Sequence, residues 1–543
     1  MPGKTRTQKR FDREWEEIGR ELELAGFEAV SVFEEYDVDT INEYIKKVRG
    51  REKVNNRYIS TRGNSPAVSF AGAVNQGMVS AGGLFVPEHV PQIDFSKLAG
   101  KPYQKVAVDT LTPYMGGFDK GEIEACVNEA YTIDSFDIPG VVKTVPVGNN
   151  KHILELWHGP TAAFKDVALQ IMPRFMRFAK AKCGDDSHTM ILVATSGDTG
   201  KAALEGFKNR DGISIVVFYP SGGVSEIQRL QMATTDGANT RVIAVRGNFD
   251  DCQNGVKALF GDEKLREEAI LRGIRFSSAN SINWGRLCPQ IVYYIKSYLD
   301  LVKSGVVSYG DEIDFCVPTG NFGNILAGYY AREMGLPIRK LICASNRNNV
   351  LTDFFASGVY DRNREFHKTM SPSMDILISS NLERFLFEMS GRDAGKIAGW
   401  YKSLNDTGKF SVGEDILGKM KSLIEACWVD EREALDAIGA LFHERDYVMD
   451  THTAVAAAAG RQARDVPVVI VSTASPYKFS VDVLKGLDIA SGDDEFEAVR
   501  RLSYTGTGPI HRAVDGLQEK PVLHDKVIDI SEMRETVRQL IVG

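Results

Sequence analysis

From residue 152 onward, short apolar runs rich in β-branched residues alternate with stretches of helical periodicity. Seven runs carry the pattern, at residues 152–157, 190–195, 213–220, 241–247, 312–320, 340–346 and 467–475. Buried parallel strands have this near-continuous apolar character because helices cover both faces of their sheet. The alternation therefore predicts an α/β fold with two packed units, each an open, mostly parallel sheet flanked by helices. Residues 355–375 and 490–530 lack such a pattern and are expected to be loops or surface helices.

Several of these predicted strands end in Gly, Ser, Thr or Asn. In open parallel sheets the ligand crevice lies outside the carboxyl ends of the strands. Functional side chains are therefore expected directly after the apolar runs.

The segment WHGPTAAFKD, residues 157–166, leaves the first run, turns through Gly-Pro and enters a predicted helix near Lys165. A lysine held there among apolar neighbours would have a lowered pKa, as Schiff-base chemistry requires. An exposed lysine at the start of a helix would have the same local sequence. The segment alone does not decide between these two interpretations.

The segment TSGDTGKA, residues 195–202, follows the second run and leads into a predicted helix. Glycines and hydroxyls at a helix N-terminus offer donors to a carboxylate or phosphate. It is not a P-loop, because Thr195 and Ala202 stand where that motif needs Gly and Ser or Thr. An ordinary turn capped by Asp198 or Thr199 is the alternative.

Two further segments follow strands near the end of the pattern. PTGNFGN, residues 318–324, contains glycines that allow close approach of the backbone to an oxyanion, and no GxGxxG dinucleotide motif. VSTAS, residues 471–475, places hydroxyls where they could bond a heterocycle nitrogen or cap a turn.

In this order, the four segments resemble the motifs of the threonine synthase family, which are pyridoxal-phosphate enzymes of fold type II. The resemblance rests on HGPTAAFKD at 158–166, TSGDTG at 195–200, GNFGN at 320–324 and STAS at 472–475. It includes YISTRG at 58–63, SAGGLFVP at 80–87 and SSANSINWGR at 277–286. The similarity spans about residues 58–483 and implies the tryptophan synthase β-like fold.

The resemblance also implies a cofactor, pyridoxal 5'-phosphate, and residues that hold it. Lys165 matches the cofactor lysine, Thr473 the hydroxyl that faces the pyridine nitrogen, and Asp198 lies in the motif beside the cofactor ring. The loop that cradles the cofactor phosphate matches Gly320, Asn321, Phe322, Gly323 and Asn324.

The implied reaction converts O-phospho-L-homoserine and water to L-threonine and phosphate, with Lys165 as the catalytic base. Ser196 and Thr199 match the motif next to the substrate carboxylate. For the substrate phosphate, the candidates are Arg286 with Asn283, or Ser60, Thr61 and Arg62, and an exposed salt bridge is the alternative role for either arginine.

Two other functions stay open at this point. A phospholyase or dehydratase of the same cofactor class would release 2-oxobutyrate, and the motifs do not separate it from a synthase. A homologue that keeps the fold as a non-catalytic binding module is disfavoured by the intact Lys165 and GNFGN motif.

The expected division of the chain follows these motifs. A helical extension at 1–54 precedes an N-terminal domain of the threonine synthase type at 55–145. An α/β unit at 146–310 carries Lys165 and TSGDTG and includes the smaller domain. A second unit at 311–543 carries the phosphate loop and C-terminal helices. The length of 543 residues exceeds one ordinary core and agrees with several domains.

Charge and cysteine usage limit the partners and the compartment. A net charge of −8 gives no field to gather nucleic acid, so we expect none as a partner. No apolar run reaches the length of a membrane helix, and no segment resembles a secretory leader, which favours the cytoplasm. The seven cysteines form no CxxC pair, so we expect buried free thiols and no metal. We expect a monomer or homodimer.

Overall fold

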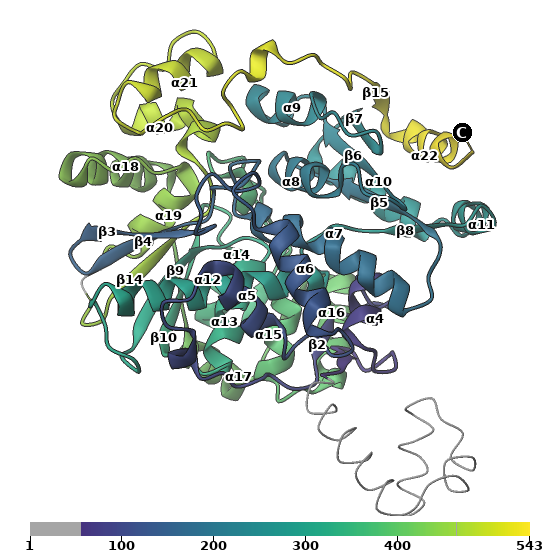
Figure 1. The fold of residues 1–543 in the computed structure, drawn as a ribbon, viewed down its shortest axis with the longest axis horizontal. Helices are drawn as coiled ribbons and strands as arrows, with labels where there is room; N and C mark the ends of the chain where they lie inside the picture. Colours follow the sequence, from purple (N-terminus) through teal and green to yellow (C-terminus); the bar gives the residue numbers. More distant parts are fainter. Residues whose placement is uncertain (1–55, 463, 543) are drawn as a thin grey trace, which may run out of the picture. The chain divides into compact units, whose positions relative to one another are not determined.

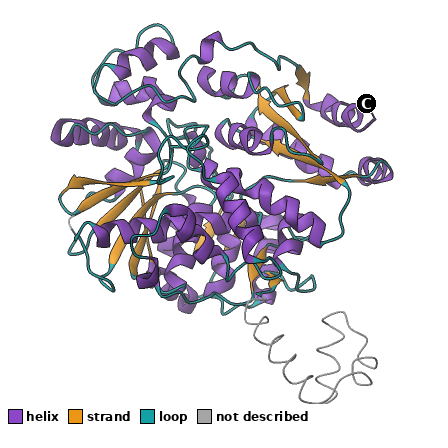
Figure 2. Ribbon diagram, in the orientation of Figure 1, coloured by secondary structure: helices purple, strands orange, loops and turns teal. Residues whose placement is uncertain are grey.

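The computed structural model describes residues 56–462 and 464–542. The predicted helical extension at 1–54 lies outside the described residues. In the described part, strands gather into two separate groups with helices around them, as Figure 2 shows. Each group is one of the two larger sheets, and two antiparallel strand pairs accompany them. The pairs are β1 (Tyr58–Ser60) with β2 (Phe85–Pro87) and β11 (Val359–Asp361) with β12 (Lys409–Ser411).

The larger sheet has six strands in the order β13-β10-β9-β14-β4-β3. All neighbours are parallel except β3 and β4, which form an antiparallel edge. The strands are β13 (Ile424–Trp428), β10 (Ile338–Ser345), β9 (Ile313–Pro318), β14 (Val468–Ser472), β4 (Lys151–Glu155) and β3 (Lys143–Gly148).

The smaller sheet has five strands, all parallel, in the order β15-β7-β6-β5-β8. They are β15 (Val527–Asp529), β7 (Thr240–Arg246), β6 (Ile213–Pro220), β5 (His188–Ala194) and β8 (Ile274–Ser277). All seven apolar runs are strands of these two sheets, which confirms the α/β prediction. The structure adds β3, β8, β13 and β15, whose sequences are shorter or more polar.

The helices cover the sheets and connect their strands. They are α4 (Phe70–Gln76), α5 (Tyr103–Leu111), α6 (Lys120–Ala130), α7 (Lys165–Lys182), α8 (Asp198–Phe207), α9 (Glu226–Ala233), α10 (Phe249–Gly261), α11 (Glu263–Leu271), α12 (Trp284–Lys303), α13 (Gly323–Glu333), α14 (Val350–Ser357), α15 (Leu382–Met389), α16 (Ala394–Thr407), α17 (Glu414–Leu423), α18 (Glu431–Arg445), α19 (Thr451–Ala459), α20 (Ser480–Gly486), α21 (Glu495–Ser503) and α22 (Met533–Val542). Single 3-10 turns include η2 (Pro372–Met374) and η3 (Pro476–Phe479).

Helices α7 and α12 are buried along most of their length and belong to one continuous core that includes residues of both sheets. Leu169 and Ile291 of these helices share that core with Val193 of β5 and Val317 of β9. In Figure 1, α7 lies between the two groups of strands. A residue at the start of either helix is therefore held rigidly near both sheets.

The C-terminal segment returns from the larger to the smaller sheet. After α21 the chain runs to β15, which pairs with β7, and then to α22, whose Met533 and Val537 enter the core of the smaller sheet. Figure 1 shows this segment in yellow along the top of the view. The sheets thus do not follow the predicted division at residue 311, since β15 joins strands from 146–310 and β4 joins strands from 311–543. The domain limits stay a prediction.

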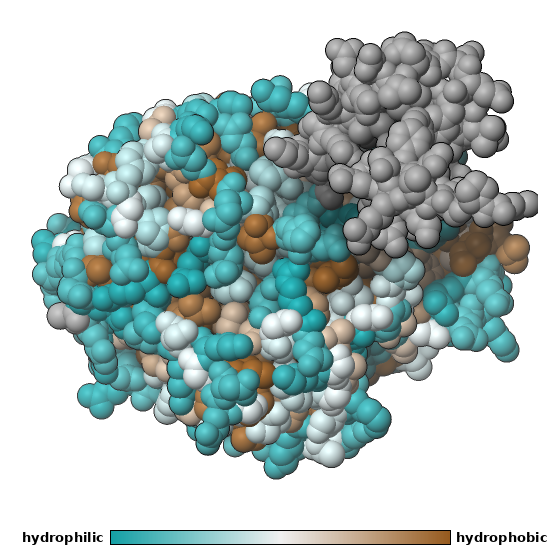
Figure 3. Space-filling model, turned by 90° about the horizontal axis from the view of Figure 1, so that it is seen from below, coloured by the Kyte–Doolittle hydropathy of each residue, from teal (hydrophilic) through white to brown (hydrophobic). Residues whose placement is uncertain are grey.

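The surface and the thiols are those of an ordinary globular chain. On the face drawn in Figure 3, hydrophobic residues appear as separate spots among hydrophilic ones. None of the helices in residues 56–462 and 464–542 combines the length and the apolar character needed to cross a bilayer. All seven cysteines are free, but only five are buried, because Cys183 is exposed and Cys427 is half-buried.

Candidate active site

A cavity of about 370 Å³ lies where the carboxyl ends of β5, β9 and β14 meet the first turns of α7, α8 and α13. Most of the predicted site residues line it together: Lys165, Ser196, Asp198, Thr199, Arg286, Gly320, Asn321, Phe322, Gly323, Asn324 and Thr473. These motifs therefore come together directly after the strands, at one cavity, and the functions of their residues stay a prediction.

Lys165 begins α7, and its side chain is almost entirely buried, with 8% exposed. Its Nζ lies 3.4 Å from Asp198 Oδ2 and 3.3 Å from Ser373 Oγ. Burial lowers the pKa of Lys165 because the charged ammonium loses its hydration; Asp198 opposes this shift, and Lys478 and Arg286 add to it. Of the two interpretations of its segment, the structure has the buried lysine with a lowered pKa, which suits it for Schiff-base and base chemistry.

Asp198 occupies the first position of α8, where the helix dipole favours a negative charge. Its carboxylate turns inward and accepts hydrogen bonds from Gln228 Nε2 (3.0 Å) and Ser373 Oγ (3.1 Å). Burial by itself would raise its pKa, but Lys478 and Lys165 outweigh burial and hold the pKa well below its usual value. The carboxylate is thus ionised and shared between two lysines.

Three contributors to this cluster gave no signal in the sequence. Ser373 lies in η2, within the stretch expected to be a loop or surface helix, and its N–H donates to His452 Nε2 over 3.2 Å. Lys478 Nζ lies 2.7 Å from Asp198 Oδ1, and Gln228 comes from α9. These side chains come from distant parts of the chain, so only the folded structure brings them together.

The loop 320–324 joins β9 to α13 and presents its backbone to the cavity. None of its N–H groups donates to a backbone carbonyl of the described residues, and no side chain caps the helix start. A Cβ built on Gly320 would lie 2.9 Å from the Ser373 carbonyl oxygen, so only glycine fits there. Phe322 takes the left-handed conformation, with φ 63°, to turn the chain into α13. Unused N–H groups at a helix start are a binding site for a dianion.

Asn324 and Thr473 complete this side of the cavity. Tyr293 and Tyr294 each donate to Asn324 Oδ1 over 2.7 Å, which leaves its buried Nδ2 without a partner among the described residues. Thr473 follows β14, and its backbone carbonyl accepts from Phe164 N over 2.8 Å, so the strand end is tied to the residue before Lys165. Thr473 therefore lines the cavity from the end of β14, the strand that pairs with β9.

Arg286 is a buried cation without a carboxylate. It lies in the first turn of α12 with 4% of its surface exposed, and its Nη1 donates to the Ala279 carbonyl over 2.7 Å. None of the described carboxylates forms an ion pair with it, and its Nε has no partner. Burial lowers the pKa of Arg286 to about 10. A buried, unpaired guanidinium at a cavity is a site for an anion rather than a surface salt bridge.

The other predicted phosphate ligands do not line the cavity. Arg62 forms a bidentate ion pair with Glu383, with distances of 3.0 and 2.8 Å, and Thr61 donates to the same carboxylate. Ser60 Oγ donates to Asn64 over 2.7 Å. Asn283 caps α12, with its Oδ1 accepting from Gly285 N and its Nδ2 donating to the Val74 carbonyl. These residues stabilise the β1 turn and the helix that carries Arg286.

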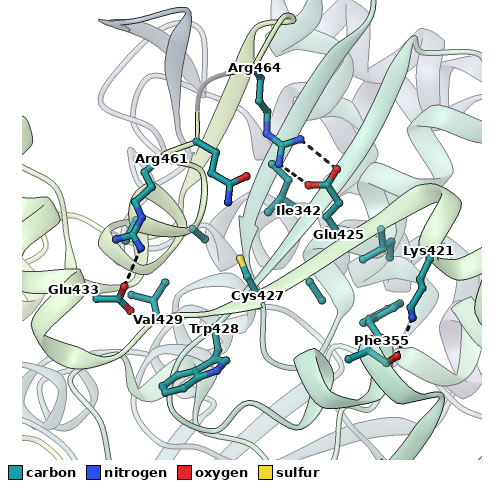
Figure 4. Close-up of a pocket in the computed structure, with 16 residues that line it drawn as sticks. Ile342, Phe355, Lys421, Glu425, Cys427, Trp428, Val429, Glu433, Arg461 and Arg464 are labelled. Atoms are coloured by element: carbon teal, nitrogen blue, oxygen red, sulfur yellow. Dashed lines mark hydrogen bonds and ion pairs between the residues drawn. The ribbon is translucent and has the colours of Figure 1, made fainter.

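A second cavity, of about 500 Å³, lies along the edge strand β13 and contains none of the predicted residues (Figure 4). Its charged side chains already have partners, since Arg464 pairs with Glu425 and Arg461 lies 3.1 Å from Glu433. Within residues 56–462 and 464–542, no three His, Cys, Asp or Glu side chains are grouped to hold a metal ion. The predicted site residues thus gather at the Lys165 cavity and not along β13.

Comparison with known proteins agrees with this geometry. Residues 57–131 match the family described as "Threonine synthase N terminus", and residues 148–473 match the family described as "Pyridoxal-phosphate dependent enzyme". The chain is 40% identical over 436 residues to threonine synthase of Pseudomonas aeruginosa, a match that covers 79% of this chain and 90% of that protein. It belongs to the threonine synthase family.

Two further members extend the comparison. The PLP-bound threonine synthase of Brucella melitensis superposes with a TM-score of 0.80 at 36% identity, over 90% of this chain and all of that one. Human threonine synthase-like 1 is 38% identical over 493 residues, 87% of this chain and 66% of that protein. The fold type II architecture and dependence on pyridoxal phosphate are thus confirmed for this threonine synthase.

The residues at the cavity fit that cofactor. It needs an amine for its aldehyde carbon, donors for its phosphate dianion and a wall that excludes water from its ring. Lys165 offers the amine, and the unused N–H groups of the loop 320–324 offer the donors. Among the described residues, the unpartnered Asn324 Nδ2 is a further buried donor at the same wall.

Proposed function

We propose that this enzyme converts O-phospho-L-homoserine and water into L-threonine and phosphate, with Lys165 as the residue that carries the cofactor and moves the protons. The observation that carries the proposal is the buried Lys165 beside Asp198, facing the loop 320–324 across one cavity, in a chain of the threonine synthase family. Pyridoxal phosphate, when bound, supplies the electron sink for proton removal next to the substrate amine.

In this proposal the cofactor is held by three parts of the chain. The Lys165 amine would bind its aldehyde carbon, and the N–H groups of the loop 320–324 would bind its phosphate. The Thr473 hydroxyl would hold its ring nitrogen, with Asp198 near the ring. A hydroxyl there, in place of a carboxylate, would leave the ring nitrogen uncharged and so would moderate the electron withdrawal that the cofactor supplies.

Lys165 then acts as an acid and base. With cofactor and substrate bound, the Lys165 Nζ would remove the proton from the substrate Cα and transfer protons at Cβ. Ser373 and Asp198 hold Nζ within 3.4 Å, so the amine stays near the reacting carbons. Ser196 and Thr199, at the start of α8, are the proposed ligands of the substrate carboxylate.

Arg286 is the proposed ligand of the substrate phosphate, because it is the cavity's buried guanidinium and forms no ion pair with the described residues. The phosphate would supply the anion that this cation lacks, and phosphate release would restore the unpaired state. The assignment of the protein to the cytoplasm and to a monomeric or homodimeric state stays a prediction.

The test is an absorbance spectrum of the purified protein with and without O-phospho-L-homoserine, with threonine, phosphate and 2-oxobutyrate assayed in the same tube. We expect a visible band from lysine-bound cofactor and equal amounts of threonine and phosphate. The variant K165A should lose both the band and turnover. Release of 2-oxobutyrate would instead identify a phospholyase, and a colourless, inert protein that takes up no cofactor would identify a binding module.

A further inference from the structure

A second buried lysine lies behind the catalytic one. Lys478 belongs to η3, five residues after Thr473, and its side chain is fully buried. Its Nζ lies 2.7 Å from Asp198 Oδ1 and donates to the Thr161 carbonyl over 3.1 Å. Lys478 is not among the residues that line the cavity, and its shared ion pair with Asp198 links it to Lys165.

The cations around Asp198 outnumber the carboxylates. Lys165 and Lys478 approach different oxygens of this one carboxylate, and Arg286 adds a third cation. Buried Asp166 is the second carboxylate, and Thr161 donates to it and accepts from Lys478. The remaining neighbours of Asp198 are uncharged hydrogen-bond donors, Gln228 from α9 and Ser373 from η2. His452 from α19 contacts the cluster through the Ser373 N–H.

The two lysines differ in how closely they hold the Asp198 carboxylate. Lys478 is 0.7 Å nearer to it than Lys165, from 2.7 against 3.4 Å, and it also has the Thr161 carbonyl as an acceptor. Lys165 has a longer ion pair and a serine hydroxyl, so the carboxylate stabilises a positive charge on Lys165 less strongly.

We propose that Lys478 is a positioning residue for Lys165: it neutralises Asp198, so that this carboxylate holds the Lys165 amine in place without holding a proton on it. The inference rests on the proposed role of Lys165 as the cofactor lysine. The lowered pKa of Lys165, to which Lys478 contributes, agrees with it.

The experiment measures how fast Lys165 reacts with the cofactor as a function of pH. Pyridoxal phosphate is added to the full-length chain after removal of its cofactor, and the visible band of the lysine-bound form is followed with time. K478Q keeps an amide near Asp198 but loses the charge. In this variant the acid-side midpoint of the rate against pH should rise by about one pH unit. The rate at a given acidic pH should therefore fall about tenfold.

Two variants separate charge from structure. K478R keeps the positive charge and should keep the wild-type midpoint. The double variant K478Q/D198N removes both charges, so its midpoint should return toward that of the wild type. A purely structural role for Lys478 predicts no such recovery, because a second buried replacement would only add to the damage.

The following results would overturn the proposed role of Lys478 or of Lys165. A folded K478Q with an unshifted midpoint, or a double variant shifted as far as K478Q, would overturn the proposal. If K478Q does not fold, D198N is compared with K478Q/D198N: the midpoint of D198N should be the lower one, because it keeps the Lys478 charge, and equal midpoints would overturn the proposal. Borohydride reduction and peptide mass analysis identify the modified lysine. If K165A still forms the band, the proposed role of Lys165 is wrong, independently of Lys478.

Discussion

At the scale of single residues, the charged side chains proposed to act at the site are buried without a full set of ion-pair partners. Half-buried Arg62 has a full partner, because it forms an ion pair with the buried carboxylate of Glu383. Arg286 and Lys165 are buried instead, one with no carboxylate and the other with a shared one. Since an unpaired buried charge is costly, such groups persist where a ligand completes them.

We predict that Arg286→Gln raises the KM for O-phospho-L-homoserine by about tenfold or more, with a smaller effect on kcat, because a charge-assisted hydrogen bond to phosphate is lost. Steady-state kinetics measure both constants. Arg229→Gln is the matched control, since Arg229 lies in a surface ion pair with Glu226. An unchanged KM in the Arg286 variant would remove this residue from the phosphate site.

At the scale of elements, the site contains a contact between the loop 320–324 and the 3-10 turn η2. The turn η2 lies directly against Gly320 of the loop 320–324. The same η2 brings Ser373 to Lys165. The proposed phosphate-binding loop and the proposed cofactor lysine therefore share one packing neighbour.

Gly320→Ala is predicted to weaken cofactor binding about tenfold, because a Cβ there meets the Ser373 carbonyl oxygen at 2.9 Å and the Met374 Cα at 3.1 Å. Titration of the cofactor-free chain with pyridoxal phosphate measures the change. Gly418→Ala in α17 is the control, since a Cβ at Gly418 meets open space. Equal affinities of the two variants would contradict a cradle role for the loop.

At the scale of the whole molecule, the C-terminal segment ties the two sheets together. It leaves α21, contacts α9 through the Ala233 carbonyl, and completes the smaller sheet with β15 and α22. On the way, buried His511 packs at the edge of Trp157, two residues beyond β4. Stability of the smaller sheet therefore depends on residues nearly 300 positions away from its strands.

Met533→Ala is predicted to lower the free energy of unfolding by about 2–4 kcal/mol, because Met533 is buried and packs tightly over Gly255 of α10. Val542→Ala, at an exposed position of the same helix, should have little effect. Denaturant unfolding curves of both variants provide the measurement. If both substitutions lower the free energy of unfolding equally, the packing of α22 does not stabilise the core of the smaller sheet.

Buried His511 makes the folding stability of the molecule sensitive to acid. Burial lowers its pKa to about 4, so between about pH 6.5 and pH 4 the unfolded chain binds a proton that the folded chain does not. Stability from this group is thus present above pH 6.5 and is lost as the pH falls. The free energy of unfolding of His511→Asn, relative to that of the wild type, should rise by about 2 kcal/mol as the pH falls from 7 to 5. Thermal unfolding of both proteins at pH 7 and at pH 5 tests this prediction, and an equal loss of stability in the two proteins would refute it.

The sequence by itself determined the strands and the motifs. Near-continuous apolar runs locate seven strands because burial between helices demands them, and the motifs after these runs identify the family and most of the cavity wall. The same reasoning missed β15 and β13, whose short or mixed sequences resemble loops.

Only the tertiary structure decided which polar groups meet. Arg286 and Arg62 both stand in family-like motifs, but Arg286 is buried at the cavity and Arg62 is paired with Glu383. Ser373 reaches Lys165, and Lys478 reaches Asp198, from more than 200 positions away. Such contacts follow from how strands order within a sheet, and local periodicity carries no information about that order. The sequence thus determined which chemistry this chain supports, and the packing determined the protonation and the partners of the residues that perform it.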